Sequence, residues 1–219
     1  MRGEPSCPKC GGRVRAPGLF ADSWQCAAHG SVHPVQPVVP PSVNALTAVV
    51  NRSRVPVWMP WPLPVGWLFT GAACAGDDRT GGRATVVACS GPGPLGGPGE
   101  LVLVAEEPGV GLGARYGGVP GPDPGPGLES AGPPESKVLA AGHPAPLWPV
   151  PGAPADRAVF AGEAAGLWLW VVVWPELCGP LLQEDLVLAD LREVGAELDL
   201  VPCGALSPRL TAPGSPGLP

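Results

Sequence analysis

The sequence contains no isoleucine, two lysines and one tyrosine among its 219 residues. Its longest apolar stretch, 164–175, is 12 residues long, whereas a membrane-spanning helix needs ~20. The amino-terminal run MRGEPSCPKC has no apolar core of the kind that a secretory signal peptide requires. We therefore expect a cytoplasmic protein that has no membrane segment and keeps its thiols reduced.

Motifs for nucleotide binding and nucleophilic catalysis are also lacking. The glycine-rich run from Gly109 to Gly113 matches neither G-x-G-x-x-G nor G-x-x-x-x-G-K-[ST]. Glu106 and Glu107, which precede this run, would repel a phosphate group. No serine lies in a G-x-S-x-G frame. We therefore predict no catalytic residues.

Glycine and proline are abundant, with 33 of each, and hydrophobic residues make up 45% of the chain. The hydrophobic fraction excludes a wholly disordered protein, and the glycine and proline predict extensive loops. The formal net charge of -6 is uneven: residues 1–36 hold four basic and two acidic side chains, and the remainder holds nine basic and 17 acidic ones. An acidic body repels a phosphate backbone, so only the amino-terminal segment favours nucleic acid.

Metal-ligand spacing is the clearest feature that is present. Cys7 and Cys10 form a C-x-x-C pair, and after 15 intervening residues Cys26 and His29 repeat the two-residue gap. Three thiolates and an imidazole are ligands of a closed, tetrahedral, structural Zn²⁺ site. We prefer His29 as the fourth ligand because of the matching gap, with His33 as the geometric alternative. A thioredoxin-like dithiol at the first pair has less support, since no strand pattern precedes it and no helix pattern follows.

Proline content divides the chain into segments. We expect a zinc ribbon over residues 1–36, in which two short strands each present one ligand pair. Residues 37–41 (PVVPP) are expected to form a proline-rich linker. Residues 42–206 then form the body, and residues 207–219 form a flexible tail.

Hydrophobic periodicity predicts an α+β body with a mainly antiparallel sheet and a few helices. Ser42 is a favourable N-cap for a helix that runs to Val50, and 183–194 also has helical spacing. The segment 54–64 is too rich in proline for regular structure, and 91–99 is predicted to be a loop. Strands are expected, in chain order, at 66–75, 83–90, 101–105, 137–147, 158–164, 167–174 and 197–201.

Tryptophan is concentrated in two segments. Trp58, Trp61 and Trp67 lie among prolines, which indicates either a contact surface for a partner or ligand, or a loop that seals the core. In the second segment, 167–174, the tryptophans all lie at even-numbered positions, and the odd-numbered positions are leucine or valine. Both faces of this strand are therefore apolar, so we expect a central strand that is buried on both sides.

Four segments resemble an uncharacterised protein family of high-GC actinobacteria: CPKCGGRVRAPGLFADSWQCAAHG, VPVWMPWPLPVGWLFTG, GPGPLGG and GLWLWVVVWP. The resemblance covers the chain to about Leu210. It implies an N-terminal zinc ribbon followed by a body that is a domain of unknown function. Some members carry a phosphotransacetylase label, for which this sequence has no corresponding site.

We therefore expect a zinc-binding interaction or regulatory module with a protein partner. The ribbon is the first expected contact surface, and the segment that contains Trp58, Trp61 and Trp67 is the second. One alternative is an enzyme, such as an acyl or phosphoryl transferase, with a pocket beside that tryptophan segment. The other alternative is nucleic-acid binding by the ribbon through basic side chains, which are Arg2, Lys9, Arg13 and Arg15.

Overall fold

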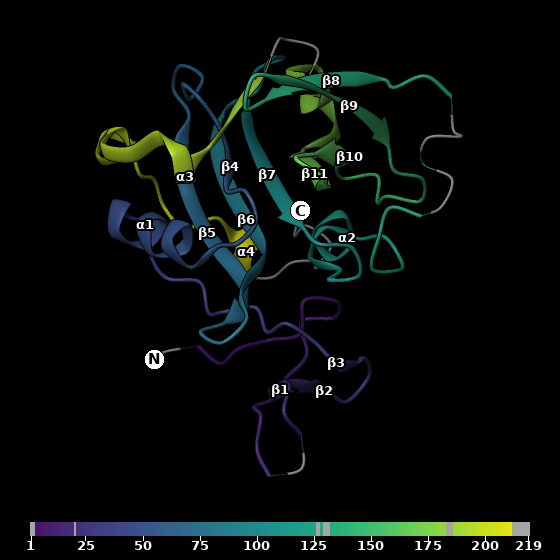
Figure 1. The fold of residues 1–219 in the computed structure, drawn as a ribbon. Helices are drawn as coiled ribbons and strands as arrows, with labels where there is room; N and C mark the ends of the chain where they lie inside the picture. Colours follow the sequence, from purple (N-terminus) through teal and green to yellow (C-terminus); the bar gives the residue numbers. More distant parts are fainter. Residues whose placement is uncertain (1–2, 20, 126–127, 129–131, 183–185, 212–219) are drawn as a thin grey trace.

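The computed structural model of the protein describes residues 3–19, 21–125, 128, 132–182 and 186–211. Within that part of the chain, no helix combines the length and the apolar character needed to cross a membrane. A small amino-terminal head, residues 3–33, projects from one end of a larger body (Figure 1). The head contains a sheet in the order β1-β2-β3, whose strands are Val14–Arg15, Gln25–Cys26 and Gly30–Ser31.

The body is built on a nine-stranded sheet in the order β4-β12-β8-β9-β10-β11-β7-β6-β5. Only the pair β12 and β8 is parallel among its registered strand pairs. This arrangement confirms the α+β class with a mainly antiparallel sheet. The strands are β4 Trp58–Pro60, β5 Leu68–Asp77, β6 Gly81–Pro92, β7 Pro98–Glu106, β8 Ser136–Ala140, β9 His143–Pro149, β10 Ala158–Ala164, β11 Leu167–Trp174 and β12 Val187–Asp190.

Short helices cover both faces of the sheet. Side chains of α1, α3 and η3 belong to the hydrophobic cluster on one face, and side chains of α2 and α4 belong to the cluster on the other. Ser42 caps α1 as the sequence predicts, because its hydroxyl accepts a hydrogen bond from the Ala45 amide at 3.1 Å. The helices are α1 Val43–Arg52, α2 Leu112–Gly117, α3 Leu191–Val194 and α4 Pro208–Thr211, with 3₁₀ segments η2 Glu176–Leu182 and η3 Gly195–Leu200.

Strand β11 lies in the interior of the sheet, between β10 and β7. Leu169, Val171 and Val173 enter one hydrophobic cluster, whereas Trp170 and Trp174 enter the other. The predicted central strand with two buried faces is thus confirmed. Each fully buried side chain of this size contributes about 1.5–3 kcal/mol to folding.

The helix predicted over 183–194 is wrong for residues 186–190. Val187–Asp190 is strand β12, which pairs with β8 and β4, and only Leu191–Val194 is helical. Leu186, Leu188 and Asp190 are buried at every second position, which is strand spacing, whereas Val187, which has helical spacing with Leu191 and Val194, is 41% exposed. Residues 183–185 lie outside the described part of the chain.

Other boundaries also differ from the prediction. The segment 54–64 contains strand β4, and 197–201 is mostly the 3₁₀ turn η3 rather than a strand. The predicted loop at 91–99 shortens to 93–97, since β6 and β7 both extend into it. The single strand predicted at 137–147 is a hairpin, β8 and β9, whose turn residues Ala141 and Gly142 have φ of 47° and 79°.

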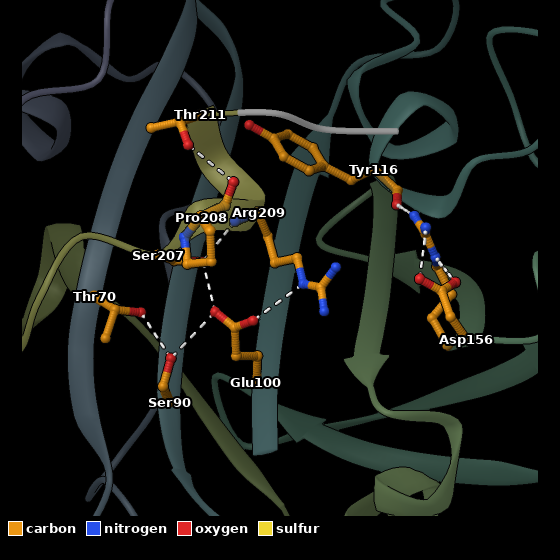
Figure 2. Close-up of polar contacts among 10 residues, drawn as sticks. Thr70, Ser90, Glu100, Tyr116, Asp156, Ser207, Pro208, Arg209 and Thr211 are labelled. Carbon is orange, nitrogen blue, oxygen red and sulfur yellow. Dashed lines mark hydrogen bonds and ion pairs between the residues drawn. The ribbon is translucent and has the colours of Figure 1, made fainter. Parts of the chain in front are cut away.

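The first residues of the predicted flexible tail are ordered against the sheet. The Ser207 hydroxyl donates to Glu100 at 2.6 Å, and the Arg209 guanidinium donates to the same carboxylate at 3.1 Å (Figure 2). Leu210 is buried in the cluster that contains Trp174. The prediction of a tail beginning at residue 207 is therefore wrong for 207–211, and 212–219 lie outside the described residues.

Candidate metal centre

The four predicted metal ligands come together in the head. One potential ligand atom from each of Cys7, Cys10, Cys26 and His29 lies within 4.8 Å of the other three. The Cys10 and Cys26 Sγ atoms are 3.8 Å apart, and the His29 Nδ1 atom lies 3.6 Å from the sulfurs of both Cys7 and Cys26. This group could hold one metal ion in a closed four-ligand site.

Local backbone geometry presents the ligands. In the first pair, the Gly11 amide donates to the Cys7 carbonyl at 2.9 Å, and Gly11 has a φ of 71° that favours glycine. In the second pair, Cys26 lies on β2 and pairs with Val14 of β1. The short sheet therefore fixes the distance between the two pairs.

The alternative ligand His33 lies outside this cluster. Burial lowers the pKa of the His33 imidazole, and the nearby Arg83 charge adds to that effect. Among the described residues, the histidine in the cluster is His29, which the repeated two-residue gap favours.

The buried thiols of the site differ in acidity. Burial raises the pKa of Cys7 to about 11. Burial acts in the same direction on Cys26, but hydrogen bonds from the Ala28 amide and the His29 ring outweigh it and lower the pKa of Cys26 to about 6. A thiolate at Cys26 is thus available at neutral pH, and a bound metal ion would deprotonate the other thiols.

Arg115 of α2 links the body to the turn that carries Cys7 and Cys10. The Arg115 guanidinium donates to the Cys7 carbonyl at 3.0 Å. It also packs against Gly11, where a Cβ atom would lie 2.8 Å from the guanidinium nitrogen. A metal ion with three thiolates and one imidazole carries net negative charge, which this cation balances.

Further contacts fix the head to the β5–β6 turn. The Trp24 indole donates to Asp77 at 3.0 Å, and Arg79 donates to the Asp22 carbonyl. Residues after the head join the body sheet, because the Gln36 amide donates to the Cys74 carbonyl at 2.9 Å on edge strand β5. The head is therefore docked on the body by side chains as well as by its linker.

Replacing Arg115 with methionine is expected to speed loss of a bound metal ion to a chromogenic chelator roughly tenfold, the scale found when a group behind a metal ligand is removed. The reason is the loss of both the hydrogen bond to Cys7 and the balancing charge. Arg15→Met is the matched control, because Arg15 is an exposed cation of the head. Equal release rates for the two variants would contradict a link through Arg115.

The tryptophans of the proposed contact surface differ in exposure. Trp58 and Trp67 are both buried in the core, whereas Trp61 is partly exposed. Trp61 and Trp67 line a pocket of about 480 Å³. Among the described residues that line this pocket, Glu197 supplies a carboxylate, and there is no cysteine, histidine or serine. The pocket predicted for the enzyme alternative thus contains no nucleophile and base pair within the described residues.

The basic residues proposed to contact nucleic acid, Arg13 and Arg15, are both exposed. Arg13 makes a loose ion pair of 3.8 Å with Glu4, in which both side chains are open to solvent. Such a pair stabilises the head little, so the Arg13 charge remains available to a partner.

A buried carboxylate at Glu106 was not predicted as a functional group. Glu106 is 0% exposed and accepts hydrogen bonds from the Leu112 amide at 2.7 Å and the Gly113 amide at 3.2 Å. It takes the place that a phosphate occupies in a true phosphate loop. A Cβ on Gly113 would lie 2.1 Å from the Trp170 ring, so close packing, not nucleotide binding, explains a glycine there.

Arg115 and Glu106 were both missed because their partners are remote in the sequence or belong to the backbone. The available signal for Glu106 was a carboxylate at the end of an apolar strand, three residues before the glycine-rich run that begins at Gly109. Arg115 gives no comparable signal, because it contacts a residue 108 positions away.

A model of a family of unknown function, DUF6758, matches residues 1–210. No curated protein and no solved structure matches the chain. The resemblance to an uncharacterised family is confirmed to that extent. Since the match spans nearly the whole sequence and includes the cysteine and histidine cluster, the chain belongs to this family of unknown function.

Proposed function

We propose that the protein is a zinc-dependent interaction module, in which a structural Zn²⁺ folds the head and the body holds the head in a fixed orientation. The observation that carries this proposal is the convergence of four potential ligand atoms within 4.8 Å. All seven cysteines are free, which fits a reducing compartment, and we place the protein in the cytoplasm.

Ligand spacing supports zinc as the metal. Sulfur at about 2.3 Å and nitrogen at about 2.05 Å from a tetrahedral ion are separated by about 3.8 Å (S···S) and about 3.6 Å (S···N). The observed separations are 3.8 Å between Cys10 and Cys26 and 3.6 Å between His29 and each buried cysteine. Four protein ligands leave no position for a reacting water, so the ion is assigned a structural role.

The solvent-facing part of the head is the proposed partner surface. Leu19 is 99% exposed in the loop between β1 and β2, and that loop points away from the body (Figure 1). Arg13 and Arg15 flank the loop and are exposed as well. An exposed leucine beside two cations fits an acidic protein surface that has an apolar pocket.

Elemental analysis tests the zinc assignment: protein purified without added metal should contain one zinc ion per chain. Metal-free protein, or stoichiometric iron, would contradict it. Capture from a native lysate by the zinc-loaded protein tests the partner surface. We expect a retained protein that is lost with Leu19→Ser and is unaffected by nuclease; loss on nuclease treatment would instead identify nucleic acid as the partner.

A further inference from the structure

A second candidate contact surface lies on the body. The tryptophan pocket, formed by residues 61–67 and 200–202 together with Glu197, has a volume of about 480 Å³. Val65 and Leu200 on its rim are 96% and 80% exposed. Exposed apolar side chains that adjoin a pocket extend its apolar surface, which is a feature of contact sites. None of the lining residues belongs to the metal-binding head.

The pocket is held in a fixed shape by backbone hydrogen bonds and core packing. The Trp61 amide donates to the Val187 carbonyl at 2.9 Å, and the Trp67 amide donates to the Pro64 carbonyl at 3.0 Å. The Trp67 side chain is buried in the core, and Trp61 packs against the same cluster. A rigid pocket loses little conformational entropy when it binds a partner.

The charged residues near the pocket indicate which kind of side chain it binds. Glu197 lines the pocket, and Glu193 and Asp199 are exposed on the same short stretch of chain. The neighbouring cation, Arg192, is already paired with Asp190 at 2.6 Å. Glu197 therefore places a negative charge at the pocket, which the partly exposed Trp61 side chain also lines, and both features attract a cation.

We propose that the tryptophan pocket binds a lysine or arginine side chain that is flanked by apolar residues in a protein partner. The cation would lie against an indole face and pair with Glu197, while the flanking residues cover Val65 and Leu200. This inference rests on the proposed role as an interaction module, but it uses a surface separate from the zinc-bound head.

The experiment uses a dye-labelled, blocked heptapeptide with one central arginine among leucine and proline residues. Its control replaces arginine with citrulline, which is nearly the same shape and neutral. Fluorescence anisotropy with the zinc-loaded full chain should show binding of the arginine peptide, about tenfold weaker for citrulline. Equal affinity for the two peptides, or no binding of either, would overturn the proposal.

Two substitutions localise the binding without threatening the fold, because both side chains are exposed. Glu197→Gln should weaken the arginine peptide about fivefold and reduce its salt dependence, and Leu200→Ser should weaken both peptides. Glu163→Gln, which removes an exposed carboxylate from β10, is the matched control. If Glu163→Gln weakens peptide binding as much as Glu197→Gln does, the peptide does not bind at the tryptophan pocket and the proposal is overturned.

Two further outcomes separate this inference from the proposed function. Concentration-dependent dimerisation that Leu200→Ser abolishes would identify a second copy of the chain as the occupant and overturn the cationic partner. Zinc content is measured on the same samples. If the purified protein contains no zinc but binds the arginine peptide, the pocket is supported and the zinc assignment is contradicted. If the protein contains zinc but binds no peptide, the zinc assignment is supported and the pocket proposal is contradicted.

Discussion

Replacing Cys10 with serine is expected to lower zinc affinity more than a hundredfold and to unfold the head while the body stays folded. Structural zinc contributes about 10–16 kcal/mol in small zinc domains. Loss of one of four ligands removes roughly a quarter of that, about 3 kcal/mol, which is more than a hundredfold in affinity. Cys10 is exposed, so the substitution itself leaves no cavity in a core.

The proposed dependence of the head on a metal ion follows from the small size of its own core. Its buried hydrophobic cluster consists of Cys7, Cys26 and Val32, with Val14 and Trp24 packed against it. The body has two much larger clusters, one on each face of its sheet. A segment with so few buried side chains needs a metal or a disulfide to fold.

Two-dimensional NMR of the full chain measures this effect. Amide signals from residues 3–33 should lose their dispersion in Cys10→Ser, and signals from β6, β7 and β11 should remain. Cys203→Ser is the matched control, because Cys203 is also exposed and lies outside the cluster. Intact dispersion of the head signals in Cys10→Ser would remove the basis for a structural metal.

The metal site was predictable because its information is local. Two ligand pairs with equal gaps specify two tight turns, and a single ion then joins them. The same locality explains why β11 was predicted correctly, since its alternating tryptophans and aliphatic residues report burial on both faces within eight residues. In both cases the physical cause lies within a short window of sequence.

Strand β12 was not predictable in this way. Its pairing partners, β8 and β4, lie far away in the sequence. The segment carries both a helical spacing, at Val187, Leu191 and Val194, and a strand alternation, at Leu186 and Leu188. Tertiary pairing therefore decided between strand and helix. The contact of Arg115 with Cys7 is equally non-local, so the sequence predicted the ligands but not the residue that docks them on the body.

Unfolding free energy should fall as pH rises from about 5 to about 8, with a contribution from Glu106 that Glu106→Gln removes. Burial raises the pKa of Glu106 to about 8, although the Leu112 and Gly113 amides oppose the shift. In the unfolded chain, a glutamate titrates near pH 4.3. Between these values the folded protein holds a proton that the unfolded chain has released, so stability falls with rising pH by up to about 1.4 kcal/mol per unit.

Urea denaturation of zinc-loaded protein at pH 5 and pH 8 gives the test, with the difference between variant and parent as the measured quantity. Glu106→Gln cannot ionise, but its Nε2 group cannot accept a hydrogen bond as the second Glu106 oxygen does, so a constant difference in stability is expected at both pH values. Beyond that constant difference, the stability of the variant relative to the parent should rise from pH 5 to pH 8. Glu107→Gln is the matched control, because Glu107 is partly exposed and pairs with Arg83 at 2.7 Å. A parent and a Glu106→Gln variant with parallel pH profiles would show that Glu106 is ionised in the folded state throughout.

Glu106 also connects the sheet to the metal centre. Its carboxyl group accepts hydrogen bonds from the first amides of α2. The same helix carries Arg115, whose side chain donates a hydrogen bond to the Cys7 carbonyl. If the cost of burying a charge at Glu106 outweighs its hydrogen bonds to these amides, local opening of α2 should make zinc release from the parent accelerate between pH 7 and pH 9 more than release from Glu106→Gln. Equal acceleration in both proteins would confine the effect of Glu106 to the body.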